Sequence, residues 1–268
     1  MNIESLKLVY FSPTATTKKI LEGISRGISA GHAEHCELTL PDSCTVEALE
    51  AHADLTLIGA PVYAGRIPAV AAERVSRLRA ANEPVVVVVV YGNRAYEDAL
   101  LELSGLAEQL GFRPVAGGAF IGEHSFSNTE TPIAVGRPDR EDLLMAEAFG
   151  DTIRRKLASA GSFADLPALQ VPGNIPLKER PVLPAASPVT KEDLCTKCGD
   201  CVFLCPTAAI SLNDVLTTDE QACIHCCACV KGCPLQARIV EDERIRKITQ
   251  WLSTNFQQRR EPETFFAI

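Results

Sequence analysis

The stretch PVVVVVV, residues 84–90, decides how the first part of this sequence folds. Its run of valines leaves no polar position that would face water. Such a β-branched run is typical of a central parallel strand that is buried on both faces. It is also far shorter than the ~20 residues that a membrane-spanning helix needs. The run therefore predicts a strand in the middle of a parallel sheet.

Strand-like and helix-like segments alternate on both sides of this run. We expect strands over Leu6–Phe11, His35–Leu40, Asp54–Gly59, Pro84–Val90 and Pro114–Ile121, and helices over Thr16–Ser29, Ala69–Ala80, Tyr96–Gly111 and Asp139–Ala158. The alternation implies right-handed βαβ crossovers and a doubly wound α/β domain over residues 1–160. Five parallel strands fit the flavodoxin-like order 2-1-3-4-5.

The remainder of the chain has a different character. Residues 161–188 are rich in proline and predict an extended, semi-rigid linker. We expect it to be pinned to the domain surfaces, with a free tether as the alternative. Its apolar anchors would be Val171, Ile175, Leu177 and Leu183.

Residues 241–268 predict a C-terminal helix and tail. Four apolar side chains share one face of this helix near Trp251: Ile245, Ile248, Leu252 and Phe256. An apolar face usually packs on a domain, and docking of a partner is the alternative.

Residues 189–240 contain nine of the eleven cysteines of the chain, within an internal repeat. The pattern C-x2-C-x2-C-x3-C-P begins at Cys195 and again at Cys223. In the bacterial two-cluster pattern the fourth cysteine of each copy ligates the other cluster. The first [4Fe–4S] cluster would then take Cys195, Cys198, Cys201 and Cys233, and the second Cys205, Cys223, Cys226 and Cys229. The alternative, zinc, fits this interlocked order poorly because it takes four ligands in two pairs.

The other cysteines do not fit the repeat. Cys227 adjoins Cys226, so we expect its side chain to point away from the cube and to pack as a small buried residue. The alternative is a spare thiol that replaces a ligand or is oxidised. We interpret His225 as a supporting or surface residue, and Cys36 and Cys44 as structural.

The loops after the strands of the first domain predict a ligand pocket, because ligands of doubly wound sheets bind there. Residues 12–17, SPTATT, place four hydroxyl side chains at a helix N-terminus, which is an anion site. The chain lacks GK[ST] and GxGxxG there, so a nucleoside triphosphate or a dinucleotide is not indicated. A phosphate monoester such as FMN suits the loop. The loops 61–68 and 91–96 combine glycine, arginine and tyrosine, and tyrosines can stack on a flavin while glycines let backbone approach its edge.

These motifs give the chain a family resemblance. The cysteine repeat resembles the bacterial two-[4Fe–4S] ferredoxins over about residues 189–240. The segments SPTATT, PVYAGRIP, YGNRAYEDALLEL and IGEHSFS resemble flavodoxin over about residues 4–160. Together they resemble the flavodoxin–ferredoxin fusion family, in which one chain carries both modules.

The resemblance implies which residues would hold FMN. Its phosphate would lie against Ser12, Thr14, Ala15, Thr16 and Thr17, and its isoalloxazine between Pro61, Val62, Tyr63, Ala64, Gly65, Arg66 and Tyr91, Gly92, Asn93, Arg94, Tyr96. Arg66, Arg94 and His124 would stabilise a reduced flavin or bind a substrate. Ala15 departs from the glycine usual in flavodoxin phosphate loops. If that position requires positive φ, alanine costs about 1 kcal/mol there.

The resulting prediction is an electron carrier that passes electrons between two [4Fe–4S] clusters and FMN, with redox proteins as partners. The resemblance implies low potentials and a place in anaerobic metabolism. The alternatives are a ferredoxin-dependent flavin reductase acting on a small substrate, or a flavin-free ferredoxin with a docking module. No Ser/His/Asp set, paired-carboxylate motif or pyridine-nucleotide fingerprint is present, so direct NAD(P)H oxidation is not expected.

Charge and termini narrow the class of protein further. The formal net charge is −8, and no part of the chain is basic enough for a nucleic-acid footprint. The N-terminal MNIESLKLVYFS lacks the layout of a signal peptide. We therefore expect a cytoplasmic protein without a membrane span.

Overall fold

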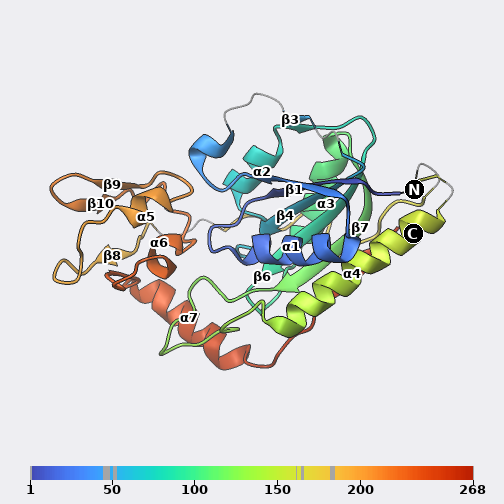
Figure 1. Cartoon of the computed structure of the whole chain (residues 1–268). Coiled ribbons are helices and arrows are strands. Elements are labelled where there is room, and N and C mark those ends of the chain that lie inside the picture. Colours follow the sequence, from blue (N-terminus) through green and yellow to red (C-terminus); the bar gives the residue numbers. More distant parts are fainter. Residues whose placement is uncertain are drawn as a thin grey trace.

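Five parallel strands and one antiparallel strand form the main sheet, in the order β12-β7-β6-β4-β1-β2 (Figure 1). The computed structural model describes residues 2–44, 49–50, 53–160, 162–163, 166–181 and 185–267. The strands are β1 (Ser5–Tyr10), β2 (His32–Glu37), β4 (Leu55–Pro61), β6 (Pro84–Tyr91), β7 (Arg113–Ile121) and β12 (Glu263–Phe266). The five parallel strands have the flavodoxin-like order. The predicted α/β fold class is therefore confirmed.

The valine run forms the central strand β6, and its side chains alternate between two cores. Val85, Val87 and Val89 enter the core on one face of the sheet. Val86, Val88 and Val90 enter the core on the other face. Since successive side chains of a strand point to opposite faces, only a continuous apolar run can serve both cores.

Helices cover both faces of the sheet. The helices α1 (Thr16–Ile28) and α4 (Arg140–Ser159) lie on one face, and α2 (Ala69–Val75) and α3 (Ala99–Gln109) on the other (Figure 1). Two glycines let α1 and α4 approach closely. A Cβ added at Gly27 would lie 1.9 Å from the carbonyl oxygen of Glu147, and one at Gly150 would lie 2.1 Å from that of Ile24.

Three elements depart from the sequence prediction by three or more residues at one or both ends. The edge strand β2 spans His32–Glu37, whereas the sequence predicted His35–Leu40. Most of its side chains are exposed, so no apolar pattern marks its position in the sequence. The helix α2 ends at Val75, and the chain then forms β5 (Leu78–Arg79), which pairs with β3 (Leu49–Glu50). The helix α3 begins at Ala99 rather than Tyr96, because Glu97 adopts a positive φ of 44°. A short 3-10 helix, η1, spans Pro41–Cys44.

The C-terminal tail supplies the sixth strand, which the sequence did not predict. Residues of β12 pair antiparallel with β7, with Phe265 opposite Gly117 and Phe266 opposite Ala116. The ring of Phe266 packs on Phe149 of α4, with ring centroids 5.4 Å apart. The tail therefore protects an edge of the sheet that would otherwise present unpaired backbone groups.

The linker is pinned rather than free. The carboxylate of Asp98 accepts hydrogen bonds from the backbone N–H groups of Asn174 and Lys178, at 2.9 and 2.7 Å. Val171 packs against the core on the α3 side. Ile175 is 87% exposed, so its prediction as an anchor is wrong. Leu177 is half-buried. The anchor predicted at Leu183 and the side chain of Cys44 fall outside the described part of the chain.

The cysteine-rich region, residues 189–240, folds as two matching halves. Its elements are β8 (Val189–Thr190), α5 (Asp200–Phe203), β9 (Ile210–Leu212), β10 (Leu216–Thr218), α6 (Ala228–Lys231) and β11 (Arg238–Ile239). The strand β8 pairs with β11, and β9 pairs with β10. Equivalent residues of the two repeats share left-handed backbone: Lys197 with His225, and Ala208 with Gln236. The sequence repeat is thus also a structural repeat.

The C-terminal helix α7 (Glu243–Asn255) leads from this region back toward the sheet (Figure 1). Ile245 and Leu252 are buried, which confirms the packing expected of its apolar face. Ile248 and Trp251 stay about half exposed, at 48% and 52%. Among the described residues, no helix combines the length and apolar character needed to cross a membrane.

Candidate functional site

The eight repeat cysteines gather around two small cavities. The first cysteine cavity is lined by Cys195, Cys198, Cys201 and Cys233. The second cysteine cavity is lined by Cys205, Cys223, Cys226 and Cys229. Each set combines three cysteines of one repeat with the fourth cysteine of the other. The structure thus brings together the two groups that the crossed pattern predicts.

The two crossing cysteines have matching hydrogen bonds. The backbone N–H of Ala209 donates to Cys205 Sγ at 3.2 Å, and that of Ala237 donates to Cys233 Sγ at 3.2 Å. In each half the donor follows its cysteine by four residues. These bonds orient the sulfur atoms, and hydrogen bonds to cluster sulfur are one of the factors that set a cluster potential.

The cysteines are not arranged around a single ion. Within the ranges that the structure describes, no three Cys, His, Asp or Glu side chains form a site for one metal ion. A four-iron cluster makes a different demand, because each thiolate binds a separate iron atom at a corner of the cube. Its four ligands surround a volume, as the cysteines of each cavity do.

Cys227 also lines the second cysteine cavity and is 2% exposed. It adopts a left-handed φ of 57°, at the position where the first repeat has Gly199 with a φ of 86°. A side chain in this conformation costs roughly 1–2 kcal/mol. Burial raises the pKa of the Cys227 thiol well above its ordinary value. The residue is therefore buried, as its packing interpretation supposes, but it lines the cavity of the second group of cysteines, which does not support the expectation that it points away from the cube.

His225 supports the chain instead of lying on the surface. Its Nε2 lies 2.8 Å from the carbonyl oxygen of Ala186, and the residue is buried. The bond ties the end of the linker to the second repeat. Cys36 is half-buried and packs against the core on the α2 side.

A larger cavity of about 280 Å³ lies beyond the carboxyl ends of β4, β6 and β7. This edge of the sheet is where a doubly wound fold binds its ligands. Eleven of the predicted flavin residues line it: Thr14, Thr16, Pro61, Val62, Tyr63, Ala64, Gly65, Tyr91, Gly92, Arg94 and His124. We call this space the cofactor cavity.

The loop before α1 approaches the cavity with groups suited to an anion. Ala15 has a φ of 61°, so this position does require left-handed backbone. Ser12 Oγ accepts a 3.1 Å hydrogen bond from the N–H of Lys18. Thr17 is fully buried, and its Oγ1 has no hydrogen-bond partner among the described residues. Ser12, Ala15 and Thr17 do not themselves line the cofactor cavity.

Arg66 is engaged elsewhere. Its guanidinium donates to both carboxylate oxygens of Glu102, at 2.7 and 2.9 Å, and to the carbonyl of Lys178 in the linker. It does not line the cofactor cavity. The arginine in this loop therefore holds the linker against α3, and only Arg94 lines the cavity.

Asn93 and Tyr96 hold the C-terminal tail. Asn93 Nδ2 donates to the carbonyls of Phe256 and Gln258, at 2.7 and 2.9 Å. The hydroxyl of Tyr96 donates to Glu263 at 2.8 Å. The loop after β6 thus presents Tyr91 and Gly92 to the cavity while its next residues fasten the tail.

The two predicted glycines make room for protein side chains. A Cβ at Gly65, where φ is +86°, would lie 2.3 Å from Glu97, and a Cβ at Gly92 would lie 2.3 Å from the ring of His124. Any larger residue would displace those side chains. The need for glycine here therefore comes from packing within the loops.

His124 supplies a neutral hydrogen-bond donor to the cavity. Burial, with the charges of Lys231 and Arg94, lowers its pKa to about 4. Its Nδ1 lies 3.1 Å from the N–H of Phe126 and accepts from it. The proton of the neutral ring is therefore on Nε2.

Tyr63 lines the cofactor cavity and lies near the cysteines of the second repeat. Burial raises its pKa well above the ordinary value, and the nearby Cys226 and Cys227 raise it further. Its hydroxyl hydrogen-bonds with Ser125. The phenol consequently stays protonated, with its ring beside the cysteines of the second repeat.

Five residues outside the first domain also line the cofactor cavity: Ile224, His225, Ile248, Trp251 and Leu252. Sequence reasoning did not assign them to the pocket. The apolar face of α7 was the available signal, but it does not tell which surface the helix covers. Ile224 lines the second cysteine cavity as well, so the two cavities are neighbours.

Charged contacts fix this arrangement. Lys231 of α6 forms an ion pair with Glu123 and donates to the carbonyl of Ser127 at 2.6 Å. Both partners belong to the loop after β7. The cysteine-rich region is therefore docked at the edge of the sheet that opens into the cofactor cavity.

Residues 188–211 match the family model of the 4Fe-4S binding domain. Over 30 residues the chain is 67% identical to a probable ferredoxin of Methanosarcina thermophila, covering 10% of this chain and 52% of the ferredoxin. The chain thus spans about half the length of that relative. The matched segment 188–211 therefore contains the first cysteine repeat of a 4Fe-4S binding domain.

Solved structures with similar folds include flavodoxins. An archaeal flavodoxin is 13% identical, with 57% of this chain and 99% of that chain covered and a TM-score of 0.38. A flavodoxin of Streptococcus pneumoniae TIGR4 is 16% identical over 57% and 99%, with a TM-score of 0.39. The strand order of the sheet, independent of these alignments, is the evidence for the flavodoxin-like fold.

Proposed function

We propose that this protein transfers electrons between two [4Fe–4S] clusters and an FMN bound in the cofactor cavity. The observation that carries the proposal is Ile224, which lines both the second cysteine cavity and the cofactor cavity. The two cavities are neighbours, so electrons would pass within one chain.

The ligand sets follow the two cysteine cavities. The first cluster would be held by Cys195, Cys198, Cys201 and Cys233, and the second by Cys205, Cys223, Cys226 and Cys229. Three kinds of group fit an anionic cluster pair: the thiols, the backbone N–H groups of Ala209 and Ala237 that donate to Cys205 and Cys233, and the buried cation Arg238. Cys227 remains outside the ligand sets.

The cofactor cavity would hold FMN by its two ends. The N-terminus of α1, with Thr14 and Thr16, would bind the phosphate. Tyr63 and Tyr91 would flank the ring. His124 would donate a hydrogen bond from Nε2 to a ring heteroatom, and its neutral state avoids the cost of burying a charge.

The pairing of cofactors has a chemical purpose. A cluster carries one electron, whereas a flavin accepts one or two. A chain that holds both can convert between one-electron and two-electron partners. We therefore propose redox proteins as partners on the cluster side. We also propose that residues 1–160 and 189–240 are the two functional units and that residues 161–188 link them.

The test is cofactor content after anaerobic purification and incubation with FMN. The proposal predicts eight irons, eight sulfides and one FMN per chain, seen as flavin absorption in the blue above the broad cluster absorption. Iron and sulfide without flavin binding would leave a ferredoxin with a docking module. A Thr14→Val, Thr16→Val variant should bind FMN more weakly while keeping its iron.

A second candidate is a flavin reductase that receives electrons through the clusters. It is favoured by Ile248 and Trp251, which line the cofactor cavity and are about half exposed. An apolar substrate could contact both residues. Oxidation of the reduced protein by a panel of small organic acceptors, compared with oxidised ferredoxin or flavodoxin, separates the reductase from the carrier.

A further inference from the structure

Arg238 is a buried cation without a carboxylate partner. Its residue exposure is 3%, and it forms no ion pair with any carboxylate in the described ranges. Its Nη1 and Nη2 donate to the hydroxyls of Thr190 and Thr218, at 2.8 and 2.9 Å. Its Nε is buried without any hydrogen-bond partner in the part of the chain that the structure describes.

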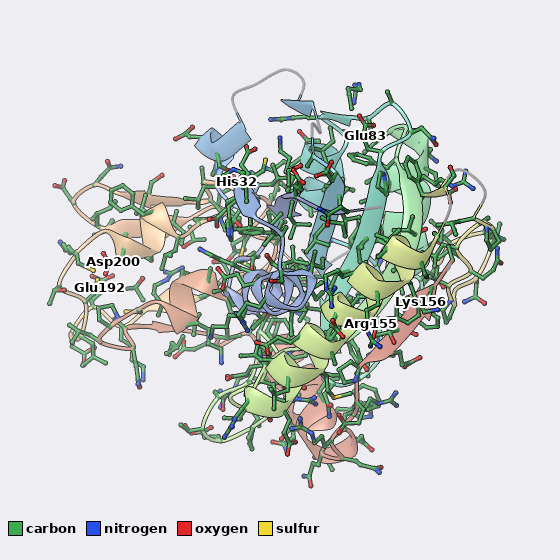
Figure 2. The ribbon with its side chains drawn as sticks, turned by 45° about the vertical axis from the view of Figure 1, so that its right-hand side comes forward. His32, Glu83, Arg155, Lys156, Glu192 and Asp200 are labelled. Atoms are coloured by element: carbon green, nitrogen blue, oxygen red, sulfur yellow. The ribbon has the colours of Figure 1, made fainter. Side chains whose placement is uncertain are left out.

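A guanidinium in this state is costly unless a negative charge lies close to it, since a buried unpaired charge loses its hydration. Arg137, another buried arginine at 6% exposure, pairs with a carboxylate. It forms a bidentate pair with the fully buried Asp142. Arg238 has two neutral hydroxyls instead. Glu192 and Asp200 do not take that role, because they lie exposed at the outer end of the cysteine-rich region (Figure 2).

The position of Arg238 relates it to both groups of cysteines. It lines the first cysteine cavity. Its Nη2 also lies 4.0 Å from the Sγ of Cys229, which lines the second. The first repeat has Ile210 at the equivalent place, so the cation is present in one half only.

We propose that Arg238 is the counter-cation shared by the two clusters and that it raises the reduction potential of both. The inference rests on the proposed ligand sets. A cluster with four thiolates is anionic and gains a further negative charge on reduction. A fixed positive charge nearby therefore stabilises the reduced state more than the oxidised state, and the low dielectric of the site strengthens this effect. The threonine hydroxyls are positioning groups that hold the guanidinium in place.

The test is an anaerobic redox titration followed by the paramagnetic signals of the reduced clusters. In Arg238→Gln, the equilibrium constant for reduction of each cluster should fall at least tenfold, which is 59 mV for one electron. Arg238→Lys should recover most of that loss because the charge is kept. Arg137→Gln removes a buried but paired arginine. It should leave the equilibrium constant for reduction of each cluster within twofold of the wild-type value. Thr190→Val with Thr218→Val should change these constants less than Arg238→Gln does.

The outcomes are separable from those of the proposed function. If the wild type lacks eight irons, the proposed function itself fails. If Arg238→Gln holds eight irons with unchanged midpoints, only the role of Arg238 is overturned. If Arg238→Gln loses iron, the Arg238→Met variant is measured in its place. Iron retained by Lys but not by either neutral residue supports the counter-cation, whereas iron lost in all three variants shows a packing role and contradicts it.

Discussion

The guanidinium of Arg74 in α2 donates a 2.6 Å hydrogen bond from Nη2 to the carbonyl of Pro206, the residue after Cys205. Its Nη1 also donates to the carbonyls of Leu38 and Thr39. Thr39 in turn accepts, through Oγ1, a hydrogen bond from the N–H of Ser12. One buried side chain therefore connects the start of the loop at residues 12–17, the anion loop, to a segment that holds a proposed cluster ligand.

Replacing Arg74 should loosen this connection. Arg74→Met removes the donors while keeping an apolar stem, and it leaves three buried carbonyls without their partner. Hydrogen bonds that involve a charged group contribute about 1.5–3 kcal/mol each, so the free energy of unfolding should fall by about 3 kcal/mol. Anaerobic denaturant titration measures this change. Arg77→Met removes a surface ion pair with Glu73, so it should change stability by less than about 1 kcal/mol. A similar effect of the two substitutions would refute the connection.

The crossed ligand sets predict that a substitution in one cysteine repeat damages the cluster held mainly by the other repeat. Cys205→Ala lies in the first repeat but should damage the second cluster. Two reference variants define the spectra, because Cys198→Ala and Cys226→Ala each remove a ligand whose assignment does not depend on the crossing. Paramagnetic spectra and iron content of Cys205→Ala should match those of Cys226→Ala. A match to Cys198→Ala instead would mean that each repeat binds its own cluster.

The anion loop carries a backbone strain that a single substitution should relieve. Ala15 has a φ of 61° and an exposed side chain, so glycine fits the same backbone without loss of packing. Ala15→Gly should raise the free energy of unfolding by about 1 kcal/mol. Ala30→Gly, beyond the end of α1, provides a control without a positive φ. Lower stability in Ala15→Gly would show that the loop tolerates alanine without strain.

His124 should make the protein sensitive to acid. Its pKa is lowered to about 4 in the folded state, from an ordinary 6.5, so the unfolded chain binds the proton more readily. The stability that it contributes is full above pH 6.5 and is lost as the pH falls from there toward 4. Between pH 7 and 5 one such group lowers the free energy of unfolding by about 2 kcal/mol.

The measurement compares the wild type with His124→Gln at both pH values. Glutamine cannot take up the proton, so the variant should lose that much less stability on acidification. Between pH 7 and 8, where the ring is neutral in both states, the difference between the two proteins should stay constant. Identical losses from pH 7 to 5 would show that His124 is not buried as described.

The fold was predictable where local pattern and topology agree. The valine run at 84–90 belongs to both cores, and the alternation of strands and helices leads directly to the observed strand order. The eight cysteines were predictable as two groups because their spacing is regular. Long-range contacts were not predictable. The segment Glu263–Phe266 is too short for its sequence pattern to predict a strand. Its pairing with β7 depends on an exposed sheet edge that exists only in the folded domain.

The cofactor cavity was predictable only where its residues follow the strands of the first domain. Strand ends located eleven of its residues, since the fold places them at one edge. Arg66 was assigned by type to the cavity, but Glu102 lies closer to it in the fold and pairs with it. Trp251 and Ile224 come from distant segments whose docking no spacing rule describes. Arg238 was overlooked because a single arginine in a short strand gives no signal until its burial is known.

The kinetics of electron transfer show whether the clusters and the flavin exchange electrons within one chain. The protein loaded with clusters and FMN is mixed with less than one equivalent of dithionite in an anaerobic stopped-flow instrument. Absorbance then follows cluster bleaching and flavin bleaching separately. If transfer occurs within the chain, electrons should leave the clusters and reach the flavin in a phase whose rate does not depend on protein concentration. A rate proportional to protein concentration would mean transfer between molecules and would contradict the shared wall at Ile224.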